Sequence, residues 1–231
     1  MDPPHDIIIV LGNPGAGKSS FLNTLAGEVI FPSGISIGSG LTRIVAEHRL
    51  KEFTLIDTPG LDDCDREIRE KAALEIENLF KRCQGFRVKI VFVLTLEAGR
   101  FRSNDRVTMD LFNDAIGFQS QYSMIFNKVE PSVMKALNLN DLSLFEGTKL
   151  SPTRSILMCE YNPALECKKN QIDTPNGKLK EFIKAAPFIV VPKTINPIQH
   201  HRLEFDVKVL RSKVEILRDK NLILKNQLDE F

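Results

Sequence analysis

The chain has 231 residues, which suits one sizeable α/β domain with an appendage rather than two domains with separate cores. Its 31 lysines and arginines nearly balance its 30 aspartates and glutamates, so composition gives no electrostatic reason to expect nucleic acid or an anionic membrane as the main partner. The four cysteines lack CxxC spacing, which favours reduced thiols and a cytoplasmic location. The sequence contains no run of about 18 apolar residues, so no transmembrane segment is predicted.

The first part of the chain predicts a strand, a loop and a helix in turn. Ile7 to Leu11 is a continuous apolar run that ends at a glycine, which is typical of a strand buried on both faces of a parallel sheet. Apolar residues at helical spacing predict a helix from Lys18 to Ala26, with Gly27 as its stop. The β-forming runs 43–50 and 53–56 are separated by two polar residues and predict a strand pair.

The middle of the chain continues this alternation. Segments 68–80 and 107–116 carry apolar residues at helical spacing. The most apolar run, Val88 to Leu96, predicts a central strand, and further strands are expected at Tyr122 to Phe126 and Ser155 to Cys159. The alternation predicts an α/β fold with a mostly parallel sheet, helices on both faces, and ligands at the carboxyl ends of the strands.

The character of the sequence changes after Ala186, so residues 1–186 form the predicted domain. Residues 187–198 contain three prolines and are a predicted connector, in which Phe188 to Val191 adds an edge strand or an extended strap. From 199 to 231, apolar residues recur at alternating spacings of four and three, which predicts an amphipathic helix with a coiled-coil seam. We expect a parallel homodimeric coiled coil; the alternative is a helix that folds back on its own domain, because a second apolar face exists.

Gly12 to Ser19 reads GNPGAGKS and fits the phosphate-loop pattern GxxxxGK[ST] between a buried strand and a helix. Its glycines permit turns in which successive N–H groups, with the positive end of the helix dipole, hold the α- and β-phosphates. Lys18 is expected to reach the β- and γ-phosphates. The alternative is a glycine-rich turn that matches by chance, expected in roughly one chain in a hundred of this length. The predicted nucleotide-binding residues here are Asn13, Pro14, Gly15, Ala16, Gly17, Lys18, Ser19 and Ser20.

Two further segments carry candidate ligands for Mg²⁺, which prefers oxygen atoms. Asp57 begins the sequence DTPG after a predicted strand, and we expect it to hold the Mg²⁺ shell together with the Ser19 hydroxyl. The N–H of Gly60, in the same motif, meets a γ-phosphate only when that phosphate is present. Thr42, which ends a glycine- and serine-rich stretch from Phe31 suited to a mobile loop, is the expected ligand in the triphosphate state. The alternatives are an ordinary β-turn and an ordinary surface threonine.

The sequence NKVE at 127–130 follows a predicted strand where guanine-binding proteins carry NKxD. A carboxylate accepts two hydrogen bonds from the N1 and N2 hydrogens of guanine, which adenine does not offer, so the acid selects the base. Glutamate keeps this chemistry with one extra methylene. Asn127, Lys128 and Glu130 are therefore the predicted base-reading residues, and Asn162, after the next strand, is a further candidate; the alternative is a lysine and a glutamate on a solvated turn.

Together these motifs resemble the immunity-associated GTPases, the GIMAP family, and their plant and microbial avirulence-induced relatives in the septin-like branch of P-loop GTPases. Residues 55–63 (LIDTPGLDD) and 40–42 (GLT) are similar to that family's DTPG segment and switch threonine. Residues 92–101 (FVLTLEAGRF), followed by Asn104 and Asp105, are similar to its hydrophobic box. The resemblance covers roughly residues 6–186, with the glutamate at 130 and the C-terminal region as departures. It implies a six-stranded P-loop GTPase domain, or G domain, with GTP or GDP and Mg²⁺ as ligands, and a homodimer formed through the nucleotide face.

Hydrolysis is less strongly indicated than binding. Leu61 follows DTPG, so no glutamine stands there to orient an attacking water, and intrinsic GTP hydrolysis is expected to be slow. Arg100 is the candidate arginine finger, supplied by a partner subunit; the alternative is a structural or surface arginine. The leading hypothesis is a GTP-binding switch with slow or dimerisation-stimulated hydrolysis, and its rivals are a nucleotide-locked scaffold without turnover and an ATP-using P-loop enzyme.

Overall fold

The computed structural model describes residues 6–34, 41–63, 65–97, 99–136, 145, 148–165, 169–170, 172 and 177–200. The chain divides into two units between Ile198 and Gln199. The predicted coiled-coil seam, residues 203–231, lies outside the described residues, as do residues 35–40 of the predicted mobile loop. None of the described helices is long and apolar enough to cross a membrane.

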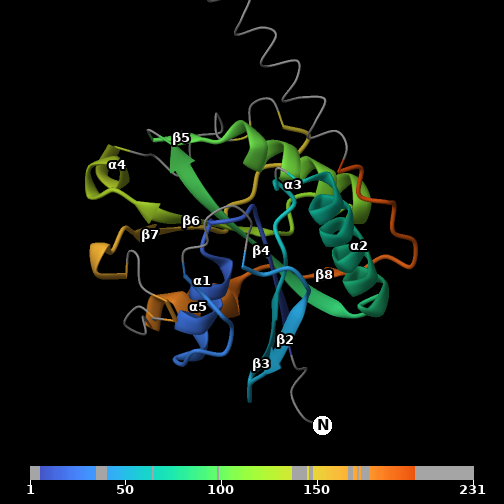
Figure 1. The fold of residues 1–231 in the computed structure, drawn as a ribbon, viewed down its shortest axis with the longest axis horizontal. Coiled ribbons are helices and arrows are strands. Elements are labelled where there is room, and N and C mark those ends of the chain that lie inside the picture. The colour runs from blue at the N-terminus through green and yellow to red at the C-terminus, as the bar shows by residue number, and fades with distance from the viewer. Residues whose placement is uncertain are drawn as a thin grey trace, which may run out of the picture. The chain divides into compact units, whose positions relative to one another are not determined.

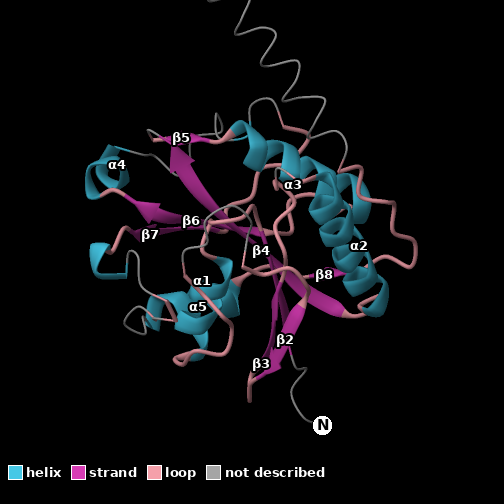
Figure 2. Cartoon of the chain, in the orientation of Figure 1, coloured by secondary structure: helices cyan, strands magenta, loops and turns pink. Residues whose placement is uncertain are grey.

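A twisted sheet forms the centre of the first unit (Figures 1 and 2). Its main path follows the order β2-β3-β1-β4-β6-β7, and the short strands β5 and β8 pair with β4. Neighbours from β3 to β7 along this path are parallel, whereas β2, β5 and β8 pair antiparallel with their neighbours. The predicted mostly parallel six-stranded sheet is confirmed, with two short antiparallel additions. The strands are β1 (Asp6–Leu11), β2 (Ala46–Arg49), β3 (Phe53–Asp57), β4 (Arg87–Glu97), β5 (Arg100–Phe101), β6 (Ser123–Val129), β7 (Ile156–Glu160) and β8 (Ile189–Val190).

Helices connect the parallel strands. The helix predicted from Lys18 to Ala26 is observed with those bounds as α1, and its end at Gly27 has the left-handed φ of 84° that glycine adopts without strain. The predicted segments 68–80 and 107–116 lie inside two longer helices, and two helices after β6 were not predicted. The remaining helices are α2 (Arg66–Arg82), α3 (Ser103–Ile116), α4 (Pro131–Ala136) and α5 (Gly177–Ala185), with a 3₁₀ turn at Pro163–Leu165.

The predicted strand pair 43–50 and 53–56 is confirmed, with Ala46 opposite Asp57 in an antiparallel ladder, although the first strand is only four residues long. The extended segment predicted at 188–191 contributes β8 beside the beginning of β4. The strand predicted at 122–126 continues through Val129, so the beginning of the NKVE sequence lies inside β6 rather than after it. The ladder with β7 is irregular between Phe126 and Val129, where Lys128 has a positive φ of 57°.

The two faces of the sheet pack against different helices. Alternate strand residues such as Ile8 and Val93 join Leu22 of α1 and Ile183 of α5 in one buried cluster. Figure 1 shows α1 beside α5, and α2 beside α3. On the other face, the ring of Phe92 lies 6.0, 5.4 and 5.9 Å from the rings of three further aromatic residues, which are Phe112, Phe118 and Tyr122. These two cores fix the helices that border the site.

A buried lysine ties α5 to the sheet. Lys89 of β4 is 5% exposed, and its ammonium lies 2.9 Å from the Asp6 carboxylate. It also donates to the carbonyl oxygens of Ile183 and Lys184, at 3.0 and 2.8 Å, in the last turn of α5. A cation at the end of a helix is stabilised by the helix dipole, so Lys89 holds α5 in place.

Candidate functional site

The glycine-rich segment Gly12 to Gly17 joins β1 to α1. A Cβ atom at Gly12 would overlap the carbonyl oxygen of Val93 in β4, so the chain passes this point only because glycine stands there. Gly17 has a left-handed φ of 96°, and a Cβ atom there would overlap the side-chain amide of Asn127. Close packing against β4 and β6 therefore fixes the path of the loop.

Lys18 begins α1 and is 6% exposed. Its ammonium donates to the carbonyl oxygens of Gly12 and Asn13, at 2.9 and 3.2 Å. Burial lowers the pKa of Lys18 to about 8, against the opposing attraction of Asp57 and Asp105. A buried cation with these neighbours is suited to meet an anion such as a phosphate, which restores the charged form.

Three oxygen-bearing side chains predicted as metal ligands meet beside the loop. The Ser19 hydroxyl donates to Oδ2 of Asp57 at 2.7 Å, the Thr42 hydroxyl donates to the same oxygen at 3.0 Å, and the two hydroxyl oxygens are 3.2 Å apart. Oδ1 of Asp57 is buried and accepts no hydrogen bond from the residues that the structure describes. Burial raises the pKa of Asp57, against the hydrogen bond from Ser19 and the attraction of Lys18. One carboxylate with an unused buried oxygen and two hydroxyls fits a hard cation such as Mg²⁺.

The DTPG segment lies against the phosphate loop. The Thr58 hydroxyl donates to the carbonyl oxygen of Val10 at 2.6 Å, which fixes the turn after β3. A Cβ atom at Gly60 would overlap Pro14, so the backbone of Gly60 lies directly beside the loop. A group held by the loop is therefore within reach of the segment that follows Asp57.

The base-reading candidates lie on the other side of the loop. Asn127 donates its amide hydrogen to the carbonyl oxygen of Ala16 at 2.9 Å, and the Lys128 ammonium donates to that of Gly15 at 3.2 Å. Glu130 is exposed and directly precedes α4. The N–H of Tyr161 donates to the carbonyl oxygen of Val129 at 2.9 Å, so the segment that carries Asn162 lies next to the NKVE sequence. The Asn162 side chain accepts a hydrogen bond from the N–H of Ala164 at 3.0 Å.

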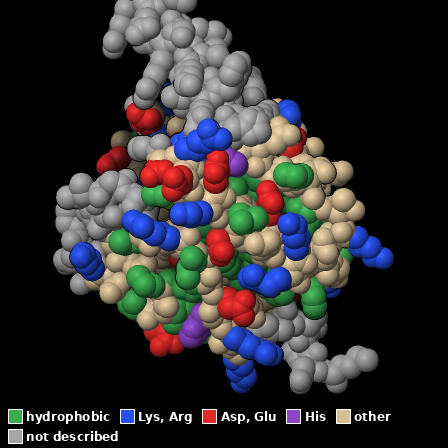
Figure 3. Space-filling model, turned by 45° about the vertical axis from the view of Figure 1, so that its right-hand side comes forward, with side chains coloured by type: hydrophobic (Ala, Val, Ile, Leu, Met, Phe, Trp, Pro, Cys, Tyr) green, Lys and Arg blue, Asp and Glu red, His purple; other side chains and the backbone are tan. Residues whose placement is uncertain are grey.

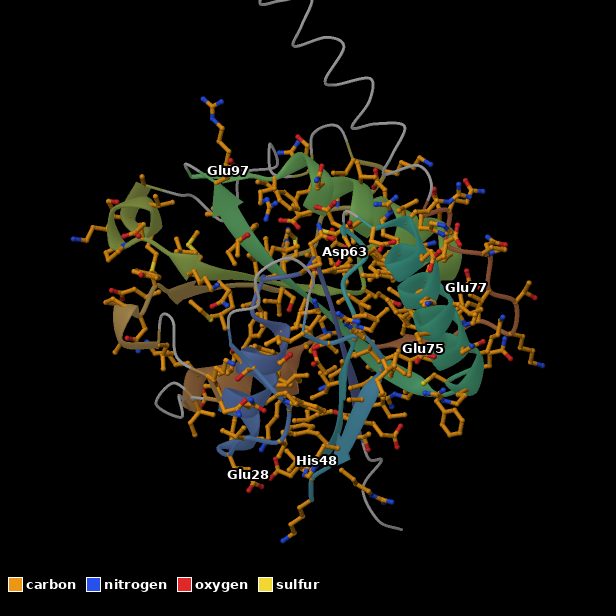
Figure 4. All side chains as sticks on the ribbon, viewed as in Figure 1. Glu28, His48, Asp63, Glu75, Glu77 and Glu97 are labelled. Carbon is orange, nitrogen blue, oxygen red and sulfur yellow. The ribbon has the colours of Figure 1, made fainter. Side chains whose placement is uncertain are left out.

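The remaining predicted site residues lie at the margins. Ser20 is half-buried in the first turn of α1, and its carbonyl oxygen accepts from the Thr24 hydroxyl at 3.0 Å. Arg100 is exposed on β5, opposite Glu97 at the end of β4, which Figure 4 labels. Leu61 is fully buried, so its side chain lies in the core.

Sequence reasoning assigned no role to Thr108 or Asp105 of α3, which contact the phosphate loop. The amide of Asn13 donates to Oδ1 of Asp105 at 2.7 Å, and its oxygen accepts from the Thr108 hydroxyl at 2.9 Å. Burial raises the pKa of Asp105 to about 6, against the hydrogen bond from Asn13 and the attraction of Arg102. The predicted helical segment began at Val107, so Asp105 lay outside it, and the available signal was the place of Asp105 after the hydrophobic box in the family resemblance. That signal did not identify what Asp105 or Thr108 contacts.

One face of the described residues carries mixed charge. On the face drawn in Figure 3, lysine and arginine side chains are interspersed with aspartate and glutamate. That face has no field of a single sign among the described residues.

Comparison with known families and curated proteins gives matches to GTPases. A family model described as "50S ribosome-binding GTPase" matches residues 7–128. GTPase Der of Streptococcus suis is 29% identical over 132 residues, which cover 55% of this chain and 28% of Der. The tRNA modification GTPase MnmE of Dinoroseobacter shibae is 31% identical over 127 residues, which cover 51% of this chain and 28% of MnmE. The matches therefore span little more than a quarter of the length of these relatives.

Solved structures share the fold. Era in complex with MgGDPNP and nucleotides of 16S ribosomal RNA matches with a TM-score of 0.52 and 20% identity, over 79% of this chain and 57% of Era. A dimerization-deficient mutant of Toc33 from Arabidopsis thaliana matches with a TM-score of 0.50 and 17% identity, over 82% of this chain and 89% of that chain. At these identities the likeness establishes the fold alone.

Proposed function

The chain belongs to the family described as 50S ribosome-binding GTPases, and from this membership we propose that it is a switch that binds GTP or GDP with Mg²⁺ and changes conformation with the state of the γ-phosphate. One observation carries the proposal: the Ser19 and Thr42 hydroxyls both lie within 3.0 Å of one oxygen of Asp57, at the end of a loop that carries a buried lysine. These residues come from three separate segments. Their meeting supports one site for phosphate and metal.

Within this site, Ser19, Thr42 and Asp57 hold Mg²⁺. A metal ion held there would offset the negative charge of the phosphates. Lys18 supplies a second positive charge from the loop, and its contacts with the carbonyl oxygens of Gly12 and Asn13 keep the ammonium over the loop. The γ-phosphate favours a conformation in which Thr42 and Gly60 both face the nucleotide, and its loss releases them.

Guanine is the proposed base. Asn127 and Lys128 brace the loop through Ala16 and Gly15, so the base-reading segment and the phosphate-binding segment form one unit. Glu130 is exposed and is therefore accessible to a base. Its carboxylate accepts from the guanine N1 and N2 hydrogens, and Asn162, on the neighbouring segment, is an additional contact.

Hydrolysis in the isolated chain is proposed to be slow. The buried Leu61 cannot orient a water, whereas the exposed Arg100 is accessible to a second subunit. In the chloroplast translocon components atToc33 and psToc159, which share this fold, dimerization is important for the GTPase activity. We propose a homodimer through the nucleotide face in which Arg100 acts on the partner's nucleotide.

We further propose the immunity-associated branch, because residues 92–101 resemble that family's hydrophobic box. Of these, Phe92 to Glu97 form the end of β4, and Arg100 and Phe101 form β5. We propose residues 1–186 as the G domain, 187–198 as a connector and 199–231 as an amphipathic helix that forms a coiled coil or folds back. A cytoplasmic location is proposed as well, supported by Cys83, a buried thiol outside any disulfide.

A nucleotide-locked scaffold without turnover is the second candidate, and the buried Leu61 favours it. An ATP-using enzyme is the less favoured rival. Calorimetry with GTP, GDP and ATP analogues in Mg²⁺ distinguishes them, with GTP and GDP expected to bind and ATP to bind weakly or not at all. Absence of binding by all three would refute the proposed function.

Phosphate release measured over a range of protein concentrations then tests turnover. The rate per molecule is expected to rise with concentration in the wild-type chain and to stay low in Arg100→Ala, with Arg82→Ala, at an exposed residue of α2, as the control. Turnover that is undetectable at every concentration would favour the scaffold. Turnover by Arg100→Ala equal to that of the wild type would remove the arginine from the mechanism.

A further inference from the structure

The first turn of α3 contacts two different parts of the nucleotide site through neighbouring residues. Asp105 accepts the Asn13 amide hydrogen at 2.7 Å, and Thr108, one turn later, donates to the Asn13 amide oxygen at 2.9 Å. Asn13, Asp105 and Thr108 are 1%, 2% and 1% exposed, so water does not compete for these bonds. An ionised carboxylate only accepts, so it fixes which end of the Asn13 amide faces which partner.

The preceding residue makes the second contact. The Asn104 amide donates to Oδ2 of Asp62 at 2.8 Å. Asp62 lies two residues after Gly60, in the segment that responds to the γ-phosphate. Figure 4 labels its neighbour Asp63 close to α3. Adjacent side chains on a helix point about 100° apart, which is why Asn104 and Asp105 reach different segments.

We propose that Asn104 and Asp105 are positioning residues with separate tasks: Asp105, with Thr108, fixes the phosphate loop through Asn13, whereas Asn104 fixes the γ-phosphate-sensing segment through Asp62. This inference rests on the proposed function. It goes beyond that function because it assigns the two tasks to one helix end and predicts a difference between nucleotides.

The difference follows from which phosphates each segment meets. The phosphate loop holds the α- and β-phosphates, which GTP and GDP share, so a change in the position of Asn13 weakens the binding of both nucleotides. The segment after Gly60 contacts only the γ-phosphate, so the loss of the hydrogen bond to Asp62 weakens the binding of the triphosphate alone. A general loss of stability would instead weaken both ligands in every variant.

The experiment measures the affinities of the full chain for GDP and for a non-hydrolysable GTP analogue, with Mg²⁺, by calorimetry. Asn104→Ala is expected to bind the GTP analogue about fivefold more weakly and GDP within about twofold of the wild type. Asp105→Ala is expected to weaken the binding of both nucleotides about tenfold, and Thr108→Val is expected to weaken both about fourfold. In each variant the loss should be similar for the two nucleotides. Ser103→Ala, at the exposed neighbouring position, is the control and is expected to bind both as the wild type does.

Asp105→Asn is a second variant in case Asp105→Ala does not fold, because an amide oxygen still accepts from Asn13. Its affinities for both nucleotides are expected to lie between those of Asp105→Ala and those of the wild type. If Asp105→Ala does not fold, Thr108→Val takes its place in this comparison. Equal losses of GTP-analogue and GDP affinity in Asn104→Ala, or no loss of either, would overturn the inference. So would wild-type affinities in both Asp105→Asn and Thr108→Val. If the wild-type chain binds neither nucleotide, the proposed function itself fails, which is a distinguishable result.

Discussion

The buried carboxyl group of Asp105 makes a quantitative prediction about stability and pH. Its pKa is raised from an ordinary value of 3.8 to about 6, chiefly because it is buried. Arg102 and Asp62 act on it in opposite directions, by attraction and repulsion. Between pH 3.8 and about 6, Asp105 therefore keeps its proton in the native state although the same group in the unfolded chain has lost it. The stability that this group contributes is lost as pH rises through this range.

The magnitude follows from the difference of about two pH units. One unit corresponds to about 1.4 kcal/mol, so the full loss is about 3 kcal/mol. Between pH 4 and pH 7 the calculated part of this loss is about 2.5 kcal/mol. Asp105→Asn has no proton to release here, so the wild type is expected to lose about that much stability relative to this variant over the interval.

The assay is urea denaturation without nucleotide, followed by circular dichroism at several pH values. Glu181→Gln, at an exposed position of α5, serves as a control whose stability should run parallel to the wild type within about 0.5 kcal/mol. A difference between Asp105→Asn and the wild type that stays constant from pH 4 to pH 7 would refute the reasoning, as would a wild type that gains relative stability as pH rises.

Three further perturbations probe the metal, the loop and the sheet. Asp57→Asn is expected to weaken GTP binding in Mg²⁺ at least about tenfold while changing GDP binding in EDTA less than about threefold; calorimetry checks this, and equal losses in both buffers would contradict it. Gly17→Ala combines left-handed backbone strain with an overlap on the side chain of Asn127, so nucleotide affinity should fall about a hundredfold. The control is Gly27→Ala, which is strained at φ 84° but has no neighbour within 4 Å. It should lose about 1–2 kcal/mol of stability and keep its nucleotide affinity. Lys89→Met leaves two helix carbonyl oxygens and a carboxylate without their cation, and should lower the free energy of unfolding, measured with urea, by about 3 kcal/mol. The control is Lys184→Met, whose ion pair is more than half exposed and which should change this free energy by less than about 1 kcal/mol. Equal losses in the two variants would argue against the role of the buried lysine.

Much of the central fold was predictable from local pattern. The apolar run Ile7 to Leu11 and the glycine-rich loop after it identified β1 and α1, because a buried parallel strand is continuously apolar and a phosphate loop needs glycine. Val88 to Leu96 identified the central strand β4 for the same reason. The helix α5 was missed. Only Leu179 and Ile183 of its nine residues are buried and no motif marks its start, whereas α1, which is equally long, directly follows the glycines of the phosphate loop.

The extent of β6 was also misjudged. The NKVE sequence was expected after the strand, yet Asn127 and Lys128 still lie within it. The strand continues because Asn127 pairs with Thr95 of β4 and because pairing with β7 resumes at Val129, after an irregularity at which Lys128 has a positive φ. No local signal reports such an irregularity, because it arises from pairing with a strand about thirty residues away.

By itself, the sequence determined the identity of the phosphate loop, the alternation of strands and helices, and the oxygen-bearing residues suited to Mg²⁺. Only the tertiary structure decided which atoms meet. Asn13 and Asp105 are 92 positions apart, and their contact depends on the order of the strands and on the rotation of α3 about its axis. Local spacing specifies which face of a helix is buried, whereas packing against the whole sheet specifies what that face contacts.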